Sequence, residues 1–180
     1  MLRIRQNIGK LFAAFVGILA MTACSSSSQA AAKQDSEALS VALDDEYRAE
    51  AIYAAIIKKF GDVRPFINII EAERRHSSRV KEDMDRIGLS YADKNPYLGK
   101  IDAPASLLDA CRRGVTAEQE NIALYDRLLP SIKDTQIRDT LTALQWASRE
   151  RHLSAFERCV ARGGTMGGGG DRGGGHGKRN

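Results

Sequence analysis

Side chains of metal-binding types interrupt the apolar faces of four expected helices. They are Glu46, Glu73, His76, Glu118 and His152. A charged side chain on the buried face of a helix is costly unless it is paired or bound to a metal ion. Because four expected helices share this feature, it indicates a site inside a helical bundle. Carboxylate and imidazole ligands together suit iron, manganese or zinc.

Each of these side chains lies on a row of residues spaced three and four apart, which is the spacing of one helix face. The row around Glu118 contains Leu108, Cys111, Val115, Ile122, Tyr125 and Leu129. Glu73 and His76 are about one turn apart, so both can bind one ion. The sequence therefore predicts an all-α fold, a left-handed up-and-down four-helix bundle over residues 36–162 with the five side chains at its middle.

Turn and cap signals divide this bundle into helices. Helix ends are expected at Gly61, Gly88 and Gly163, and helix starts at Asp62, Ser106 and Asp134. Pro130 either ends the third helix or kinks it. Since a helix rises ~1.5 Å per residue, Glu46 and His76 fall at similar distances from the first turn and should lie level with each other.

Other polar residues on or near these rows are candidates to surround the metal ligands. They are Glu50, Tyr53, Asn121, Tyr125 and Arg149. The two tyrosines are candidate hydrogen-bond partners or electron relays, although packing in the core is the simpler explanation of their positions.

The cysteines that follow Cys24 are spaced so that they can pair. Cys111 lies seven residues before Glu118, and Cys159 lies seven residues after His152. On antiparallel helices these steps move both residues two turns in the same direction. We expect a disulfide between Cys111 and Cys159, since an exported protein meets an oxidising environment; two free buried thiols are the alternative.

Residues 1–23 are typical of an export signal. Positive residues precede an apolar run at residues 11–20 that is too short for a permanent membrane span. The sequence Met21-Thr22-Ala23-Cys24 resembles a bacterial lipoprotein signal, in which Cys24 becomes the lipidated first residue, although Met21 departs from that pattern. We expect a lipid-anchored envelope protein, facing the periplasm from the outer membrane in a Gram-negative cell. An ordinary cleaved secretory signal is the alternative.

The composition of both ends differs from that of the bundle. Residues 24–35 are small and polar and are expected to form a flexible tether, and the glycine-rich residues 163–180 are expected to be a disordered tail. The ends carry the excess positive charge behind the net +4 of the chain. No basic stripe interleaved with aromatic residues indicates nucleic-acid binding. Protein partners, a homodimer among them, are left open.

The order of the candidate ligands is similar to that of a known superfamily. Glu46, then Glu73-Arg74-Arg75-His76, then Glu118, then His152, one set per helix, resembles the ferritin-like superfamily of four-helix carboxylate proteins. More narrowly, residues 36–162 resemble an uncharacterised bacterial ferritin-like domain family. The resemblance implies an iron-type site at these five residues.

Arg149 departs from the complete sites of that superfamily. There the last helix supplies a Glu three residues before its His, and Arg149 stands at this position. Asn121, one turn beyond Glu118, is a weak oxygen ligand at best. A cation one turn from His152 on the same side would oppose a second ion. We therefore expect one tightly bound transition metal at most, or an asymmetric pair.

Two functions follow from these features. The first is an iron-dependent redox protein of the cell envelope that meets O₂ or peroxide, with Glu46 and Glu118 as terminal ligands, Glu73 as the bridging or chelating ligand, and both histidines as nitrogen donors. The second is a metal-free structural or interaction module, in which the glutamates pair with the histidines and with Arg149. No nucleophile and base pair or phosphate-binding loop rises above chance, so catalysis without metal has no support.

Overall fold

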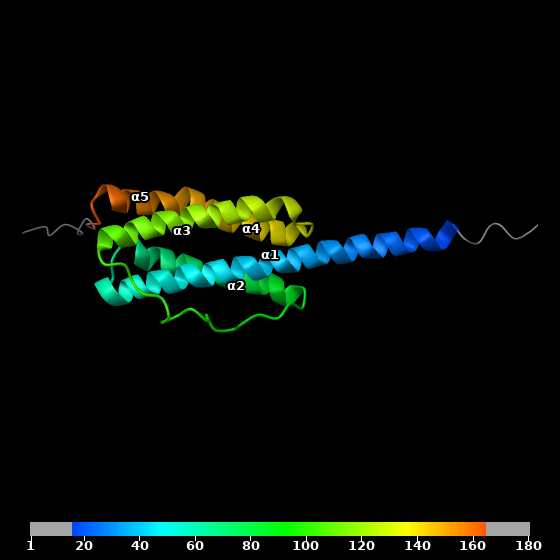
Figure 1. Cartoon of the computed structure of the whole chain (residues 1–180), viewed down its shortest axis with the longest axis horizontal. Coiled ribbons are helices and arrows are strands. Elements are labelled where there is room, and N and C mark those ends of the chain that lie inside the picture. The colour runs from blue at the N-terminus through cyan, green and yellow to red at the C-terminus, as the bar shows by residue number, and fades with distance from the viewer. Residues whose placement is uncertain (1–15, 165–180) are drawn as a thin grey trace, which may run out of the picture.

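The described part of the protein is entirely helical. The structure, a computed structural model, describes residues 16–164, with side chains from residue 28 onward, and contains no strand in that range. The helices are α1 (Val16–Phe60), α2 (Phe66–Arg86), α3 (Leu107–Leu128), α4 (Thr135–Ala147) and α5 (Leu153–Ala161), with the 3₁₀ turn η1 (Leu129–Ser131) and the π-turn η2 (Ser148–His152). Because η2 joins α4 and α5 into one rod, four helical rods lie side by side (Figure 1). The predicted all-α class is confirmed.

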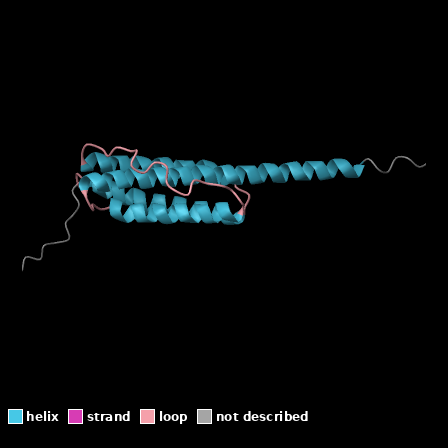
Figure 2. Ribbon diagram, turned by 90° about the horizontal axis from the view of Figure 1, so that it is seen from below, coloured by secondary structure: helices cyan, strands magenta, loops and turns pink. Residues whose placement is uncertain are grey.

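The connection after α2 makes the direction of the third rod differ from the predicted one. Residues 87–106 run back along the outside of the molecule, as the green segment in Figure 1 and the long loop in Figure 2 show. Arg86 at the end of α2 contacts Asp134 at the start of α4, with Nη2 and Oδ1 2.9 Å apart. The helices α2 and α3 therefore run in the same direction, and the up-and-down prediction was wrong.

Hydrogen bonds to α1 attach this long connection to the bundle. The Tyr47 hydroxyl donates to the carbonyl of Ala92 at 2.7 Å, and Asn95 Nδ2 donates to the carbonyl of Tyr47 at 2.8 Å. Backbone groups in an irregular segment need such partners when they lie against a protein surface. The returning connection is thus anchored at its middle.

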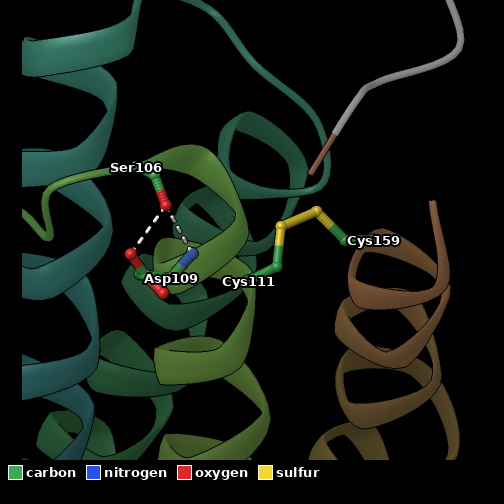
Figure 3. Close-up of a disulfide and its surroundings, with 4 residues drawn as sticks. All are labelled: Ser106, Asp109, Cys111 and Cys159. Carbon is green, nitrogen blue, oxygen red and sulfur yellow. Dashed lines mark hydrogen bonds between the residues drawn. A yellow bond between two sulfur atoms is a disulfide. The ribbon is translucent and has the colours of Figure 1, made fainter. Parts of the chain in front are cut away.

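The caps of α3 and α4 follow the predicted signals. Ser106 Oγ accepts from the backbone N–H of Asp109 at 3.1 Å and donates to its carboxylate, as Figure 3 shows. Asp134 accepts from the backbone N–H of Ile137 at 3.1 Å. Asp62 is not the cap expected for α2, because that helix begins after Pro65. Gly61, with φ +82°, ends α1 in the left-handed region that favours glycine.

The first rod extends further toward the N-terminus than the sequence predicted. Residues 24–35 continue α1 instead of forming a flexible tether, and they contain no glycine or proline that would end a helix. The side chain of Cys24 lies outside the part described. Among the side chains described, Asp35 is the first that is buried, and its carboxylate accepts from the backbone N–H groups of Lys133 and Asp134 at 2.8 and 2.9 Å. Among the described helices, none has a stretch long and apolar enough to cross a membrane.

Apolar clusters lie on both sides of the polar middle of the bundle. One contains Leu39, Leu43, Met84, Leu141 and Leu144, and the other contains Ile52, Ile56, Phe66, Ile70 and Phe156. In the second cluster α3 and α5 are also joined covalently, because Cys111 and Cys159 form a disulfide (Figure 3). The predicted cysteine pairing is thus confirmed. Its position two turns from Glu118 and His152 ties together the helices that carry those residues.

Candidate metal centre

The five candidate ligands meet in the interior between the apolar clusters. Glu46 comes from α1, Glu73 and His76 from α2, Glu118 from α3, and His152 from the last position of η2. None of these residues is more than 9% exposed. Since each comes from the buried face of its helix, packing of the rods is sufficient to bring them together.

The ligands form two triads that share Glu73. The first triad is Glu46, Glu73 and His76, and the second is Glu73, Glu118 and His152; within each, the candidate ligand atoms lie within 4.8 Å of one another. Glu73 Oε2 is 2.9 Å from His76 Nδ1, whereas Glu73 Oε1 is 3.1 Å from His152 Nδ1. The two oxygens of one carboxylate therefore face two different histidines, which is the arrangement of a bridging ligand.

The terminal carboxylates stand on either side of this bridge. Glu46 Oε2 is 3.3 Å from His76 Nδ1, and Glu118 Oε2 is 3.4 Å from His152 Nδ1. The two imidazole rings are stacked, with centroids 5.6 Å apart and planes 23° apart. Each triad thus offers two carboxylates and one imidazole nitrogen, a donor set that suits iron, manganese or zinc.

Two atoms of the second triad lack hydrogen-bond partners. Glu73 Oε1 and His152 Nδ1 are buried and close to each other, but the angles of their contact do not satisfy a hydrogen bond. Buried polar atoms are almost always paired, so an unpaired acceptor and an unpaired ring nitrogen side by side require an explanation. A metal ion bound by both atoms would supply it. The residues of the centre therefore fit a transition-metal ion.

Two tyrosines hold the terminal carboxylates from opposite helices. The Tyr53 hydroxyl, on α1, donates to Glu118 Oε1 on α3 at 2.6 Å. The Tyr125 hydroxyl, on α3, donates to Glu46 Oε1 on α1 at 2.7 Å. Each glutamate thus has one oxygen fixed by a tyrosine and the other facing a histidine. This crossed arrangement orients both carboxylates toward the centre.

Burial and the neighbouring charges both shift the pKa values of the residues in the centre. Burial lowers the pKa of both imidazoles, but the neighbouring glutamates raise it to about 9 for His76 and to about 10 for His152. Burial, and then the charge of Glu73, raises the pKa of Glu46 to about 7. Burial also acts to raise the pKa of Glu73, but contacts with His152 and His76 outweigh it and lower the pKa. Without metal, the ionised carboxylate of Glu73, which both triads share, lies between two protonated imidazoles.

Arg149 lies outside the centre, contrary to the sequence prediction. Its side chain is 46% exposed, and its Nη2 contacts Asp126 Oδ1 at 3.1 Å. A π-turn takes more residues per turn than an α-helix, so in η2 the buried neighbour one turn before His152 is Ser148, which is 2% exposed. Arg149 therefore does not oppose a second ion. The sequence reasoning assumed an unbroken α-helix.

Glu50 takes a place other than the expected one, and Asn121 pairs with a residue outside the candidate set. Glu50 is buried, but its carboxylate accepts from Arg74 Nε at 2.9 Å and from Asn95 Nδ2 at 2.8 Å, away from both triads. Asn121 donates through Nδ2 to Asp45 Oδ2 at 2.6 Å. Burial raises the pKa of Asp45 to about 6. Sequence reasoning missed Asp45 because it lies beside the row of Glu46, and its only signal was adjacency to that ligand.

Comparisons with known proteins support the fold alone. No family model and no curated protein matches the chain. Among solved structures, the hypothetical protein MJ0754 from Methanococcus jannaschii DSM 2661 is similar, with a TM-score of 0.64 and 21% sequence identity, over 73% of this chain and 82% of that one. The chain therefore shares a helical fold with a distant structural neighbour.

Proposed function

We propose that the protein binds two transition-metal ions, iron foremost, that share Glu73, and that it carries out oxidation–reduction chemistry with O₂ or peroxide. The observation that carries the proposal is the pair of buried triads with one carboxylate in common. Glu46, His76 and Glu73 Oε2 would hold one ion, and Glu118, His152 and Glu73 Oε1 the other. With Arg149 outside the centre, the positive charge expected to oppose a second ion is removed.

The chain's own residues prepare the centre for this chemistry. Bound ions would supply electrons and positions open to small oxygen species, since each triad provides only three ligands. The crossed hydrogen bonds of Tyr53 and Tyr125 keep one oxygen of each terminal glutamate occupied and leave the other for an ion. The apolar clusters on both sides of the centre limit its contact with water there, which strengthens the electrostatic attraction between the ligands and a cation.

A metal-free structural module is the second candidate function. The observation that favours it is that His76 and His152 together contact all three glutamates, so two protonated imidazoles can offset most of the negative charge of the interior. Arg149, the counter-ion on which this candidate first rested, contributes nothing there because it pairs with Asp126. A module of this kind would use its surface instead of its centre.

The export signal expected at residues 1–23 extends the proposal to the cell envelope. A lipid on Cys24 would anchor the bundle to a membrane, because two or more acyl chains suffice for stable attachment. Envelope fractionation of the Cys24→Ala variant tests this location. Continued membrane association of the variant would overturn it.

Metal content of the purified protein tests the proposed function. We expect two ions per chain in protein isolated from its native envelope and in protein titrated with Co²⁺ under anaerobic conditions. The His76→Ala, His152→Ala double variant should retain none tightly. Glu73→Gln, which keeps the shape of the shared side chain, should also fail to bind the two ions. It provides a second test if the double variant does not fold. A wild-type protein that binds no metal in either experiment would favour the structural module.

A further inference from the structure

We propose that a cavity between α1 and α3 is the entry site for the metal ions, where Asp45 and Asn121 bind a divalent cation in transit. From there the ion passes to the second triad, so that this triad fills first. The inference rests on the proposed function, because an entry site has a purpose only if the centre binds metal. It adds a binding site outside the five ligands and makes the two triads unequal.

The cavity reaches the centre from one side. Its volume is about 150 Å³, and its lining includes Asp45, Ala117 and Asn121 together with Glu73 and Glu118. Glu73 and Glu118 both belong to the second triad. Of the residues that belong to one triad alone, Glu118 lines the cavity, whereas Glu46, His76 and His152 do not. An ion that enters between α1 and α3 therefore meets the second triad before the first.

The charge of the lining favours a cation. The lining carries four carboxylates, including that of Glu120, and the two guanidinium groups of Arg48 and Arg113. Glu73 and Glu118 also contact His152, so Asp45 and Glu120 are the lining carboxylates without a histidine contact. Arg48 is already engaged, because its Nε donates to Asp44 Oδ2 at 2.7 Å and its Nη2 donates to the Tyr97 hydroxyl at 2.9 Å. A cavity lined by an excess of one charge raises the local concentration of the opposite ion and its rate of binding.

Asp45 and Asn121 provide oxygen ligands on the way in. Asn121 is 6% exposed and lines the cavity, its Nδ2 donates to Asp45 Oδ2, and its Oδ1 has no hydrogen-bond partner. That unpaired amide oxygen and the Asp45 carboxylate are oxygen donors of the type that divalent cations accept. They lack the imidazole and the second carboxylate of a triad. An ion held here is bound less tightly than at the centre and moves inward.

The rate of Co²⁺ binding, followed by stopped-flow absorption, tests the entry site. We expect Asp45→Asn to slow loading by about 10-fold or more, since it removes the carboxylate that attracts the ion, while the final stoichiometry stays that of the wild type. Ala117→Leu should slow loading to a similar degree, because it fills the cavity without changing any charge. Loading in either variant should still end with both triads occupied.

Matched variants away from the cavity serve as controls. Asp139→Asn removes the same charge from an exposed position on α4, and Ala123→Leu adds the same bulk at an exposed position on α3. Both should load at the wild-type rate.

Wild-type rates in Asp45→Asn and Ala117→Leu, with normal stoichiometry, would overturn the entry site alone. A lower stoichiometry in Asp45→Asn would make Asp45 a permanent ligand and overturn its transit role. A wild type that binds no Co²⁺ would overturn the proposed function and the entry site together.

Discussion

The terminal carboxylates are each held by groups from two other helical rods. Glu46, on α1, contacts His76 of α2 and Tyr125 of α3, while Glu118, on α3, contacts His152 of η2 and Tyr53 of α1. A carboxylate buried at this depth requires several donors, because burial alone strongly disfavours its charged form. The tyrosines are thus structural partners of the charged centre as well as core residues.

Removing either tyrosine hydroxyl should weaken the metal-free fold. We expect Tyr53→Phe and Tyr125→Phe each to lower the free energy of unfolding in urea by about 1–3 kcal/mol, since a buried carboxylate loses a donor. Tyr91→Phe is the control, because its hydroxyl contacts Asp85 on an exposed surface at 3.1 Å, and a change within about 0.5 kcal/mol is expected there. Equal effects of all three substitutions would show that the crossed bonds add no stability.

The residues of the candidate centre could be predicted from the sequence, but their partners could not. Glu46 and Glu118 interrupt apolar rows on their own helices, and that signal is local. The pairing of Tyr53 with Glu118 instead of Glu46 depends on which helices pack together, which no single row contains. Glu50 lies on the same row as Glu46 yet contacts Arg74 of α2 and Asn95 of the long connection, so a place on the row does not by itself put a side chain in the centre.

The turn η2 changes which side chains of its rod face the centre. Ser148, four residues before His152, is buried, whereas Arg149, three residues before it, is exposed. In an unbroken α-helix both positions would lie on the side of His152. No feature of residues 148–152 marks the wider turn in the sequence, so a prediction based on the period of an α-helix placed Arg149 in the centre.

Substitutions at positions 148 and 149 should distinguish the π-turn from an unbroken α-helix. Arg149→Ala is expected to leave the number of bound Co²⁺ ions unchanged and to alter the free energy of unfolding by less than about 1 kcal/mol, because its ion pair with Asp126 is exposed. Ser148→Arg should lower metal occupancy, since it puts a cation beside His152. Spectroscopic titration gives the occupancy of both. A higher metal occupancy in Arg149→Ala would instead indicate that Arg149 faces the centre, as in an unbroken α-helix.

At the scale of the whole molecule, the sequence indicates where helices begin better than it indicates how the rods are arranged. Ser106 and Asp134 cap the helices they were predicted to cap, because a cap depends on residues within one turn. The path of residues 87–106 depends on contacts made far away in the sequence, such as the bond between Tyr47 and Ala92. Apolar rows show that four rods pack together but leave their direction open.

The stability of the metal-free protein should fall as pH rises above neutrality. His76 and His152 hold their protons more tightly in the folded state, with pKa values of about 9 and about 10, than in the unfolded chain. Their contribution is therefore complete below about pH 6.5 and is lost as pH rises through the folded pKa values. We expect the free energy of unfolding in urea with a chelator present to fall by about 2 kcal/mol or more between pH 7 and pH 9.

A His76→Gln, His152→Gln double variant is the control for this dependence. Its stability should vary less over the same range, because glutamine does not titrate and only the buried carboxylates, such as Glu46 with its pKa of about 7, remain to do so. A wild-type stability that rises with pH would contradict the assignment of protons to these imidazoles.

The long connection also divides the described chain into two helical hairpins, and the disulfide lies within the second of them. The disulfide joins Cys111 to Cys159 within the second hairpin, so residues 87–106 are the only covalent link described between the halves. Yet the centre draws Glu46, Glu73 and His76 from one half and Glu118 and His152 from the other. A chain nicked in this connection would behave as a pair of complementing fragments. Metal binding would then report the reassembly of two separate molecules.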